Sequence, residues 1–297
     1  MRDFWKSREI SDYTDYKTIT RIAESEKYFF RALFYDMLRK GGYFEVTGIE
    51  YKGKRIPCRL VIFDKDGTLI DFAATWVPLI RKRSSFVLKA MGRNDQELVA
   101  FLLKSWGIDP ASGKIDPRGP CPVSPRSDEI VIGTMALYQK GYPWDEAKQW
   151  VARAFDEADA DGDWREKVVP IKGIQTFLSR LRESGFYTAL ATNDERKDTE
   201  AILNRLGMEG LFDTVLCAGE VNQPKPHPET IFSICRQLGI DPKETVMVGD
   251  SVADMMAGKR AGVALTVGIL EGGVTPREEL EKVADLVVNS IQDLKFF

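Results

Sequence analysis

One short stretch limits the fold more than any other part of the chain: four apolar residues at 60–63 run directly into Asp64 and Asp66. The segment Leu-Val-Ile-Phe is typical of a strand that is buried on both faces of a sheet. Ligands of open α/β sheets bind just beyond the carboxyl ends of such strands. Two carboxylates at a buried strand end are costly unless they meet a cation or take part in chemistry. The stretch therefore favours a functional site over the alternative, an ordinary turn of Asp and Gly residues.

The composition indicates a globular intracellular protein. The chain has 297 residues, 43% of them hydrophobic and 29% charged, and a net charge of −3, which argues against nucleic acid as a partner. We expect no membrane span, because no apolar run approaches the roughly 20 residues that one needs, and no secretory signal. Four scattered cysteines and one histidine argue against a zinc site and predict reduced thiols in the cytoplasm. These residues are Cys58, Cys121, Cys217, Cys235 and His227.

Two segments, 59–71 and 168–297, have the pattern of an α/β core. Apolar strand-like runs alternate with helical patterns in the second segment, and the first segment supplies the strand at 60–63. This alternation predicts a Rossmann-like parallel sheet that is wound by right-handed crossovers. The further strands are predicted at 187–192, 214–218, 244–248 and 264–268.

Residues 72–167 interrupt this pattern and are predicted to form an all-helical domain inserted after the first core strand. The segment holds four amphipathic helical patterns and no convincing strand. We expect helices at 75–91, 95–106, 127–139 and 144–158, with Ser127 as the N-cap of the third.

Residues 1–58 form an N-terminal extension in this interpretation. A helical pattern covers 28–39, and short strands are predicted at 43–46 and 51–56. An accessory layer on the main domain is the first interpretation, and a dimerisation or targeting element is the alternative. We expect a monomer or a homodimer.

Polar side chains follow four of the predicted strands, and a parallel sheet brings these strand ends to one edge. Carboxylates, a hydroxyl and an ammonium group together suit phosphoryl transfer with a divalent metal. Hard oxygen ligands of this kind favour Mg²⁺. The residues are Asp64, Asp66, Thr192, Asn193, Lys225, Asp250 and Asp254.

With these residues in order, the chain resembles the haloacid dehalogenase superfamily over residues 59–291. The four motifs of that superfamily match Asp64-Lys65-Asp66-Gly67-Thr68, Thr192, Lys225 in Lys-Pro-His-Pro, and the segment 249–254. The position of the helical insertion is similar to the helical cap of the phosphoglycolate-phosphatase-like branch. Residues 1–58 lie outside the resemblance.

The resemblance implies a role for each residue that would touch the substrate. Asp64 is expected to attack phosphorus and form an aspartyl-phosphate. Asp66 is expected to protonate the leaving oxygen and then to activate water. Thr192, Asn193 and Lys225 are expected to bind the phosphoryl oxygens.

The resemblance also implies a Mg²⁺ site. Its expected ligands are the Asp64 carboxylate, the backbone carbonyl of Asp66 and the Asp250 carboxylate. Asp254 is expected to orient Lys225 or a metal-bound water without binding the metal itself.

The expected function is a Mg²⁺-dependent phosphatase that hydrolyses a small phosphorylated metabolite, with phosphoglycolate as the nearest analogy. Asp66 favours rapid hydrolysis, because dehalogenases and ion-pumping ATPases of the superfamily carry other residues at that position. A phosphomutase on the same scaffold is one alternative. A catalytically silent regulatory or scaffolding protein is the other.

Several charged and aromatic residues have two interpretations. We expect Lys65 to point away from the metal, toward solvent or the helical domain. The basic run 81–83 and Arg126 favour a solvated face, with recognition of an acidic substrate group as the alternative. Trp76 and Trp106 are expected to fill the core of the helical domain, with stacking on the substrate as the alternative.

Two further features look functional but have simpler explanations. The acidic run at 156–163 resembles a calcium loop in composition, but Lys167 stands where the bidentate Glu would be needed. We therefore expect an exposed hinge there. His227 is expected to belong to a rigid Pro-His-Pro turn that aims Lys225.

Overall fold

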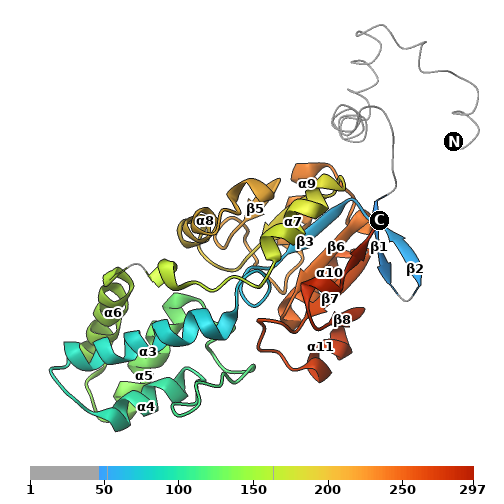
Figure 1. Cartoon of the computed structure of the whole chain (residues 1–297). Helices are drawn as coiled ribbons and strands as arrows, with labels where there is room; N and C mark the ends of the chain where they lie inside the picture. The colour runs from blue at the N-terminus through green and yellow to red at the C-terminus, as the bar shows by residue number, and fades with distance from the viewer. Residues whose placement is uncertain (1–46, 52, 163) are drawn as a thin grey trace, which may run out of the picture.

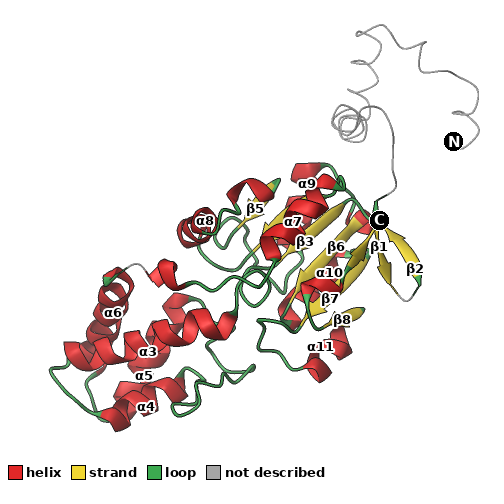
Figure 2. Ribbon diagram, viewed as in Figure 1, coloured by secondary structure: helices red, strands yellow, loops and turns green. Residues whose placement is uncertain are grey.

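A six-stranded parallel sheet forms the centre of the molecule, with strand order β5-β4-β3-β6-β7-β8 (Figures 1 and 2). The computed structural model describes residues 47–51, 53–162 and 164–297. The helix predicted at 28–39 and the strand predicted at 43–46 lie outside these residues. The α/β prediction with a parallel core is confirmed. The strands are β3 (Leu60–Phe63), β4 (Tyr187–Ala191), β5 (Thr214–Leu216), β6 (Thr245–Gly249), β7 (Leu265–Ile269) and β8 (Leu286–Val288).

The strand β3 is buried on both faces, as its apolar sequence predicts. Val61 and Phe63 belong to one apolar cluster, and Leu60 and Ile62 belong to another on the opposite face of the sheet. This alternation follows from the two-residue period of a strand. Helices must therefore cover both faces. Those that do so are α7 (Ile174–Glu183) and α8 (Arg196–Arg205) on the first face, and α9 (Glu229–Leu238) and α10 (Val252–Ala261) on the second.

A small antiparallel sheet joins the start of the described chain to its C-terminus. It has the order β2-β1-β9, and it lies at the end of the molecule away from the long helices α3–α6 (Figure 1). The single strand predicted at 51–56 is wrong, because Gly53, with φ of 72°, turns the chain between two strands. The elements are β1 (Gly48–Tyr51), β2 (Lys54–Pro57) and β9 (Lys295–Phe296), and the helix α11 (Arg277–Val283) precedes β8.

Four helices follow β3 and form a separate apolar cluster of their own. The first starts earlier than predicted, because the Asp71 carboxylate accepts a hydrogen bond from the backbone N–H of Ala74 at 2.8 Å. Ser127 is not the N-cap of the third helix: Pro125 takes that position, and Ser127 lies within the first turn. The helices are α3 (Phe72–Ala90), α4 (Gln96–Ser105), α5 (Arg126–Gln139) and α6 (Trp144–Ala160).

The chain leaves the sheet and returns to it through two adjacent backbone segments. Ile70 pairs with Pro170 in an antiparallel bridge, and the N–H of Asp71 donates to the carbonyl of Val169 at 2.8 Å. The N–H of Phe72 donates to the carbonyl of Gly272, which ties the start of α3 to the loop after β7. The helices α3–α6 are thus attached beside the carboxyl ends of the strands. None of the helices in the described part of the chain has the length and apolarity to cross a membrane.

The helices α5 and α6 approach closely at Gly133, and this contact generates a test of the packing. A Cβ atom at this position would lie 2.8 Å from Trp106 Cζ2 and 3.0 Å from Val151 Cγ1. We predict that Gly133→Ala lowers the free energy of unfolding by about 1–3 kcal/mol through overpacking. Gly210→Ala is the matched control, because nothing lies within 4 Å of the added carbon.

Urea unfolding followed by circular dichroism checks both variants. The control should be unchanged or up to about 1 kcal/mol more stable. An equally stable Gly133→Ala protein would contradict the close packing of α5 on α6.

Candidate active site

The carboxyl ends of four neighbouring strands bring the predicted site residues together. Asp64 follows β3, Thr192 follows β4, Lys225 lies in the loop after β5, and Asp250 follows β6. All four of these residues are buried. Because β4, β3 and β6 are adjacent and parallel, residues far apart in the sequence meet at one edge.

The Lys225 ammonium group connects these strand ends. Its Nζ lies 2.5 Å from Asp64 Oδ1 and 2.6 Å from Asp254 Oδ1, and it donates to the Ala191 carbonyl at 2.7 Å. These three acceptors use the three N–H donors of the ammonium group. Burial lowers the pKa of Lys225, but the carboxylates of Asp254 and Asp64 outweigh it and raise the pKa above its ordinary value. Lys225 is therefore a fixed positive charge beside Asp64.

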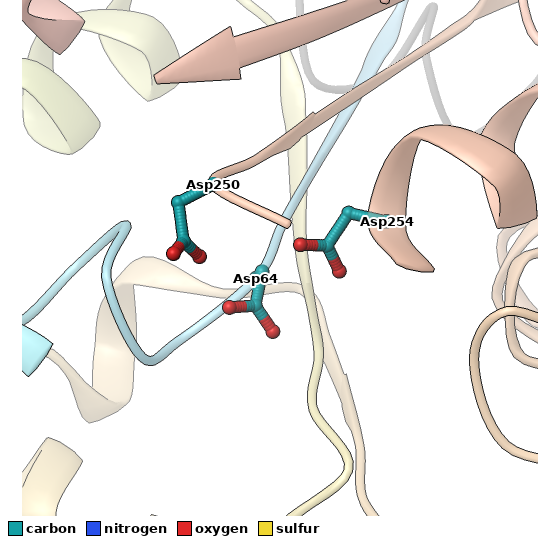
Figure 3. A group of neighbouring side chains, drawn as sticks. All are labelled: Asp64, Asp250 and Asp254. Atoms are coloured by element: carbon teal, nitrogen blue, oxygen red, sulfur yellow. The ribbon is translucent and has the colours of Figure 1, made fainter. Parts of the chain in front are cut away.

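Three carboxylates, those of Asp64, Asp250 and Asp254, surround one point at this edge (Figure 3). One oxygen from each lies within 4.8 Å of the others, and all three residues are buried. Burial raises the pKa of Asp64 to about 7 and that of Asp250 well above its ordinary value. Three buried carboxylates beside one ammonium group leave an excess of negative charge, so the donor set fits a divalent cation.

Asp254 is already engaged through both of its carboxylate oxygens. Oδ1 pairs with Lys225, while Oδ2 accepts hydrogen bonds from Ser251 Oγ at 2.6 Å and from the Ser251 N–H at 3.1 Å. The bond from the Ser251 N–H is one half of the capping box of α10, and the Asp254 N–H completes the box by donating to Ser251 Oγ at 3.3 Å. Asp64 and Asp250 are thus the carboxylates that remain available to a metal, and Asp254 holds Lys225.

Glycines let the backbone come close to these carboxylates. A Cβ atom at Gly273 would lie 2.6 Å from Asp250 Cβ, and one at Gly249 would lie 2.5 Å from Asp254 Cβ. An added carbon at Gly67 would overlap the Asp250 carboxylate. Gly67 also has φ of 80°, a conformation that other residues rarely adopt. The backbone of two loops, those that hold Gly67 and Gly273, therefore lies against Asp250.

Asp66 is held at both carboxylate oxygens. Oδ1 accepts a hydrogen bond from Trp76 Nε1 at 2.7 Å, and Oδ2 lies 2.7 Å from Lys65 Nζ. Lys65 Nζ also lies 2.8 Å from Asp194 Oδ2. Burial raises the pKa of Asp66, against the opposing effect of the Lys65 charge.

The ring of Trp76, on α3, lies 5.5 Å from the Lys65 ammonium group, so the expected contact with the helical segment is present. The alternative contact of Lys65 with solvent is wrong. Its side chain is fully buried, because Asp66 and Asp194 at the sheet edge supply two carboxylates for its charge. Sequence reasoning also missed Asp194. The signal was an acidic residue two positions after Thr192, at the same edge as a lysine flanked by aspartates.

Thr192 and Asn193 follow β4 but make different contacts. The Thr192 hydroxyl accepts a hydrogen bond from the Asp194 N–H at 3.1 Å, which leaves its own proton available to a ligand. The Asn193 amide donates to the Lys225 carbonyl at 3.0 Å and accepts from the Lys225 N–H at 3.2 Å. The Asn193 side chain thus positions Lys225.

The basic and acidic runs of the helical segment pair with each other. Arg83 is buried, and its guanidinium contacts Glu129 at 2.9 Å and Asp159 at 2.9 Å. Arg126 pairs with Asp159 at 3.2 Å and Asp156 at 2.7 Å. A solvated face is therefore wrong for Arg83. On α6, Asp159 is a partner of both arginines and Asp156 of Arg126 alone, and Asp163 lies outside the described residues.

The other side chains of the basic run are also engaged. Arg81 donates to the Pro110 carbonyl at 2.9 Å, and Lys82 pairs with Asp161. Trp106 is fully buried in the helical cluster, as predicted. His227 accepts a hydrogen bond from the Glu229 N–H at 3.3 Å, and its contacts are those of a turn.

Comparison with known proteins assigns this arrangement to a class. The fold and the acidic strand ends define an α/β protein with a candidate metal site at the edge of a parallel sheet. The sequence model of haloacid dehalogenase-like hydrolases matches residues 58–262, most of the chain. The chain belongs to that family, as the resemblance implied.

Curated relatives share moderate sequence identity with the chain. Phosphoglycolate phosphatase 1 of Pseudomonas aeruginosa is 28% identical over 251 residues, which cover 81% of this chain and 79% of that protein. The probable phosphatase IndB of Dickeya dadantii is 29% identical, over 72% of this chain and 81% of that protein. Pyrophosphatase PpaX of Bacillus velezensis is 34% identical over 46% of this chain, and the match spans 64% of that protein's length.

Solved structures share the fold. A predicted phosphoglycolate phosphatase from Haemophilus somnus superposes with a TM-score of 0.60 at 21% identity, covering 80% of this chain and 96% of that one. A Thermotoga maritima protein described as a candidate β-phosphoglucomutase gives 0.56 at 20% identity, covering 78% and 94%.

The buried ion pair of Arg83 provides a test of this part of the structure. We predict that Arg83→Met lowers the free energy of unfolding by about 3–5 kcal/mol, because Glu129 and Asp159 lose a buried partner. Arg153→Met is the matched control, since Arg153 pairs with Glu157 on an exposed face and is 69% exposed. It should change stability by less than about 0.5 kcal/mol.

The loss in Arg83→Met should also grow with pH. Burial raises the pKa of Glu129 to about 7 from its ordinary 4.5, so the folded state favours the neutral form. In the variant, Glu129 can bind a proton below its raised pKa and is then neutral without Arg83. Above that pKa it remains a buried charge without its partner, which destabilises the folded state. Denaturation at about pH 5.5 and about pH 8 measures this difference. A loss that is equal at both values would contradict the burial of Glu129.

Proposed function

We propose that the protein is a Mg²⁺-dependent phosphatase that hydrolyses a small phosphate monoester through an aspartyl-phosphate on Asp64. One observation carries this proposal: Asp64 stands between the Lys225 ammonium group and the Asp250 carboxylate, with the acid Asp66 two residues away. The family assignment and the phosphatase names of the relatives support the class of reaction.

Asp64 acts as the nucleophile in this mechanism. Its carboxylate attacks phosphorus, the bond from phosphorus to the leaving oxygen breaks, and the phosphoryl group is transferred to Asp64. The Lys225 charge, fixed by Asp254 and the Ala191 carbonyl, stabilises the negative charge that the phosphoryl oxygens carry in the transition state. The free proton of the Thr192 hydroxyl offers these oxygens a further donor.

Asp66 acts as the acid and then as the base. It donates its proton to the leaving oxygen in the first step and takes a proton from water in the second, when water attacks the aspartyl-phosphate. The buried environment that raises its pKa favours the protonated form that the first step needs.

The residues that would hold Mg²⁺ are Asp64 and Asp250, together with the Asp66 carbonyl. When bound, the ion would neutralise the excess negative charge of the site and of the substrate phosphate. Asp250 is enclosed by glycine-containing loops, so its carboxylate has few other directions to take.

We further propose that residues 72–167 form a cap over the sheet edge and that residues 59–71 and 168–297 form the catalytic core. The connection through Ile70 and Pro170 places the helices beside the active site. Such a cap would exclude water and select the substrate. The names of two relatives make phosphoglycolate the first substrate to assay.

A phosphomutase is the second candidate. The sheet, the cap and Asp66 suit it equally, and one structural neighbour bears such a description. A mutase would retain the phosphoryl group, so release of inorganic phosphate distinguishes the two.

A cytoplasmic monomer or homodimer remains the prediction from the sequence.

A panel of phosphorylated metabolites, assayed for inorganic phosphate, tests the proposal. We expect at least one to be hydrolysed, and we expect Asp64→Asn to lose more than about 10³-fold in kcat, because a carboxamide is a poor nucleophile. Removal of divalent metal with EDTA should abolish activity, and added Mg²⁺ should restore it. Activity retained by Asp64→Asn would contradict the mechanism, and activity retained in EDTA would contradict the metal requirement.

A further inference from the structure

The contacts of Asp66 come from two different parts of the molecule. Lys65, which holds Oδ2, belongs to the sheet edge. Trp76, which holds Oδ1, belongs to α3, the first helix after the sheet. One carboxylate oxygen therefore accepts a hydrogen bond, and the other is paired with a buried positive charge.

The surroundings of Lys65 hold its ammonium group beside Asp66. Its side chain is fully buried, and its ammonium group lies between Asp66 at 2.7 Å and Asp194 at 2.8 Å. Asp194 is itself anchored, because its N–H donates to Thr192 Oγ1 and its carbonyl accepts from Ala218. A buried cation with two anchored partners has little freedom to move. A hydrophobic residue at position 65 would fill the same space without holding Asp66.

Trp76 is fixed in turn by the two ends of the helical insertion. Its ring packs against Trp164, on the segment that returns to the sheet, with centroids 5.1 Å apart, and against Phe72 at 6.5 Å. The Lys65 ammonium lies 5.5 Å from the Trp76 ring centroid, so the two donors also contact each other. The indole therefore ties Asp66 to the place where the helices α3–α6 join the sheet.

We propose that Lys65, supported by Asp194, and Trp76 are positioning residues for the acid Asp66. The inference rests on the proposed function. The ammonium charge of Lys65 and the indole N–H of Trp76 hold the carboxyl group toward the oxygen that leaves phosphorus. As that bond breaks, the proton of Asp66 passes to the leaving oxygen while the bond from Asp64 to phosphorus forms. Loss of either contact should therefore lower kcat/KM more for a leaving group that needs the proton than for one that does not.

Two probes separate this role from a structural one. The p-nitrophenolate leaving group of p-nitrophenyl phosphate needs little protonation, whereas that of phenyl phosphate, of nearly the same shape, needs more. The parameter kcat/KM covers the steps up to the departure of the leaving group. The variants are Lys65→Met, which removes the charge at similar length, and Trp76→Phe, which keeps an aromatic ring but removes the N–H donor.

We expect Lys65→Met to lower kcat/KM for phenyl phosphate by about 10- to 100-fold and that for p-nitrophenyl phosphate by less than about 3-fold. Trp76→Phe should show the same selectivity with a loss of about 3- to 10-fold. Inhibition by inorganic phosphate should be unchanged in both, because neither side chain is proposed to bind the phosphoryl group.

Two variants serve as controls. Trp106→Phe also removes a buried indole hydrogen bond, here to the Glu129 carbonyl at 2.8 Å, and Lys259→Met removes a surface pair with Asp285. Both should leave the ratio of the two kcat/KM values unchanged. Equal losses for both probes in Lys65→Met and Trp76→Phe, or no loss, would overturn the inference. Absence of phosphate release by the wild-type protein from these probes and from every member of the metabolite panel would contradict the proposed function itself.

Discussion

The ion pairs of Lys225 are the interaction on which the rest of the site depends. Asp64 and Asp254 are buried, and a buried carboxylate without a partner is strongly destabilising. One ammonium group at 2.5 and 2.6 Å from them makes their burial tolerable. Lys225 and Asp254 are held in place by further hydrogen bonds. The Asn193 side chain bonds the backbone of Lys225, and Ser251 bonds the carboxylate of Asp254. The pairs still leave negative charge in excess, which is the feature that suits a divalent cation.

The parallel sheet explains why these groups can meet. Strands β4, β3 and β6 are adjacent, so each of their carboxyl ends delivers its polar residue to one edge. The two-faced burial of β3 fixes its register, and with it the direction of Asp64. The helical segment α3–α6 begins at residue 72, beside the same edge, and its helices pack around a separate apolar cluster. The fold thus places a rigid charged site beside a second packed unit.

Much of this arrangement could be predicted, because its signals are local. The apolar run at 60–63 and the alternation of strands and helices after residue 168 reflect periodic burial, and the family and the α/β fold are confirmed. What was missed depends on partners distant in sequence. Lys65 is buried because Asp194 lies on the next strand end, and Arg83 is buried because Glu129 and Asp159 lie on other helices. Side-chain periodicity alone identifies none of these partners.

The central claim is that Asp64 carries the phosphoryl group between the two steps. Acid quenching during turnover of a ³²P-labelled substrate, followed by peptide mapping, measures this directly, because aspartyl-phosphates survive in acid long enough to be isolated. The account predicts acid-stable, base-labile label on the peptide that contains Asp64, and none in Asp64→Asn. Label on a different residue, or rapid phosphate release with no labelled protein at any quench time, would contradict it.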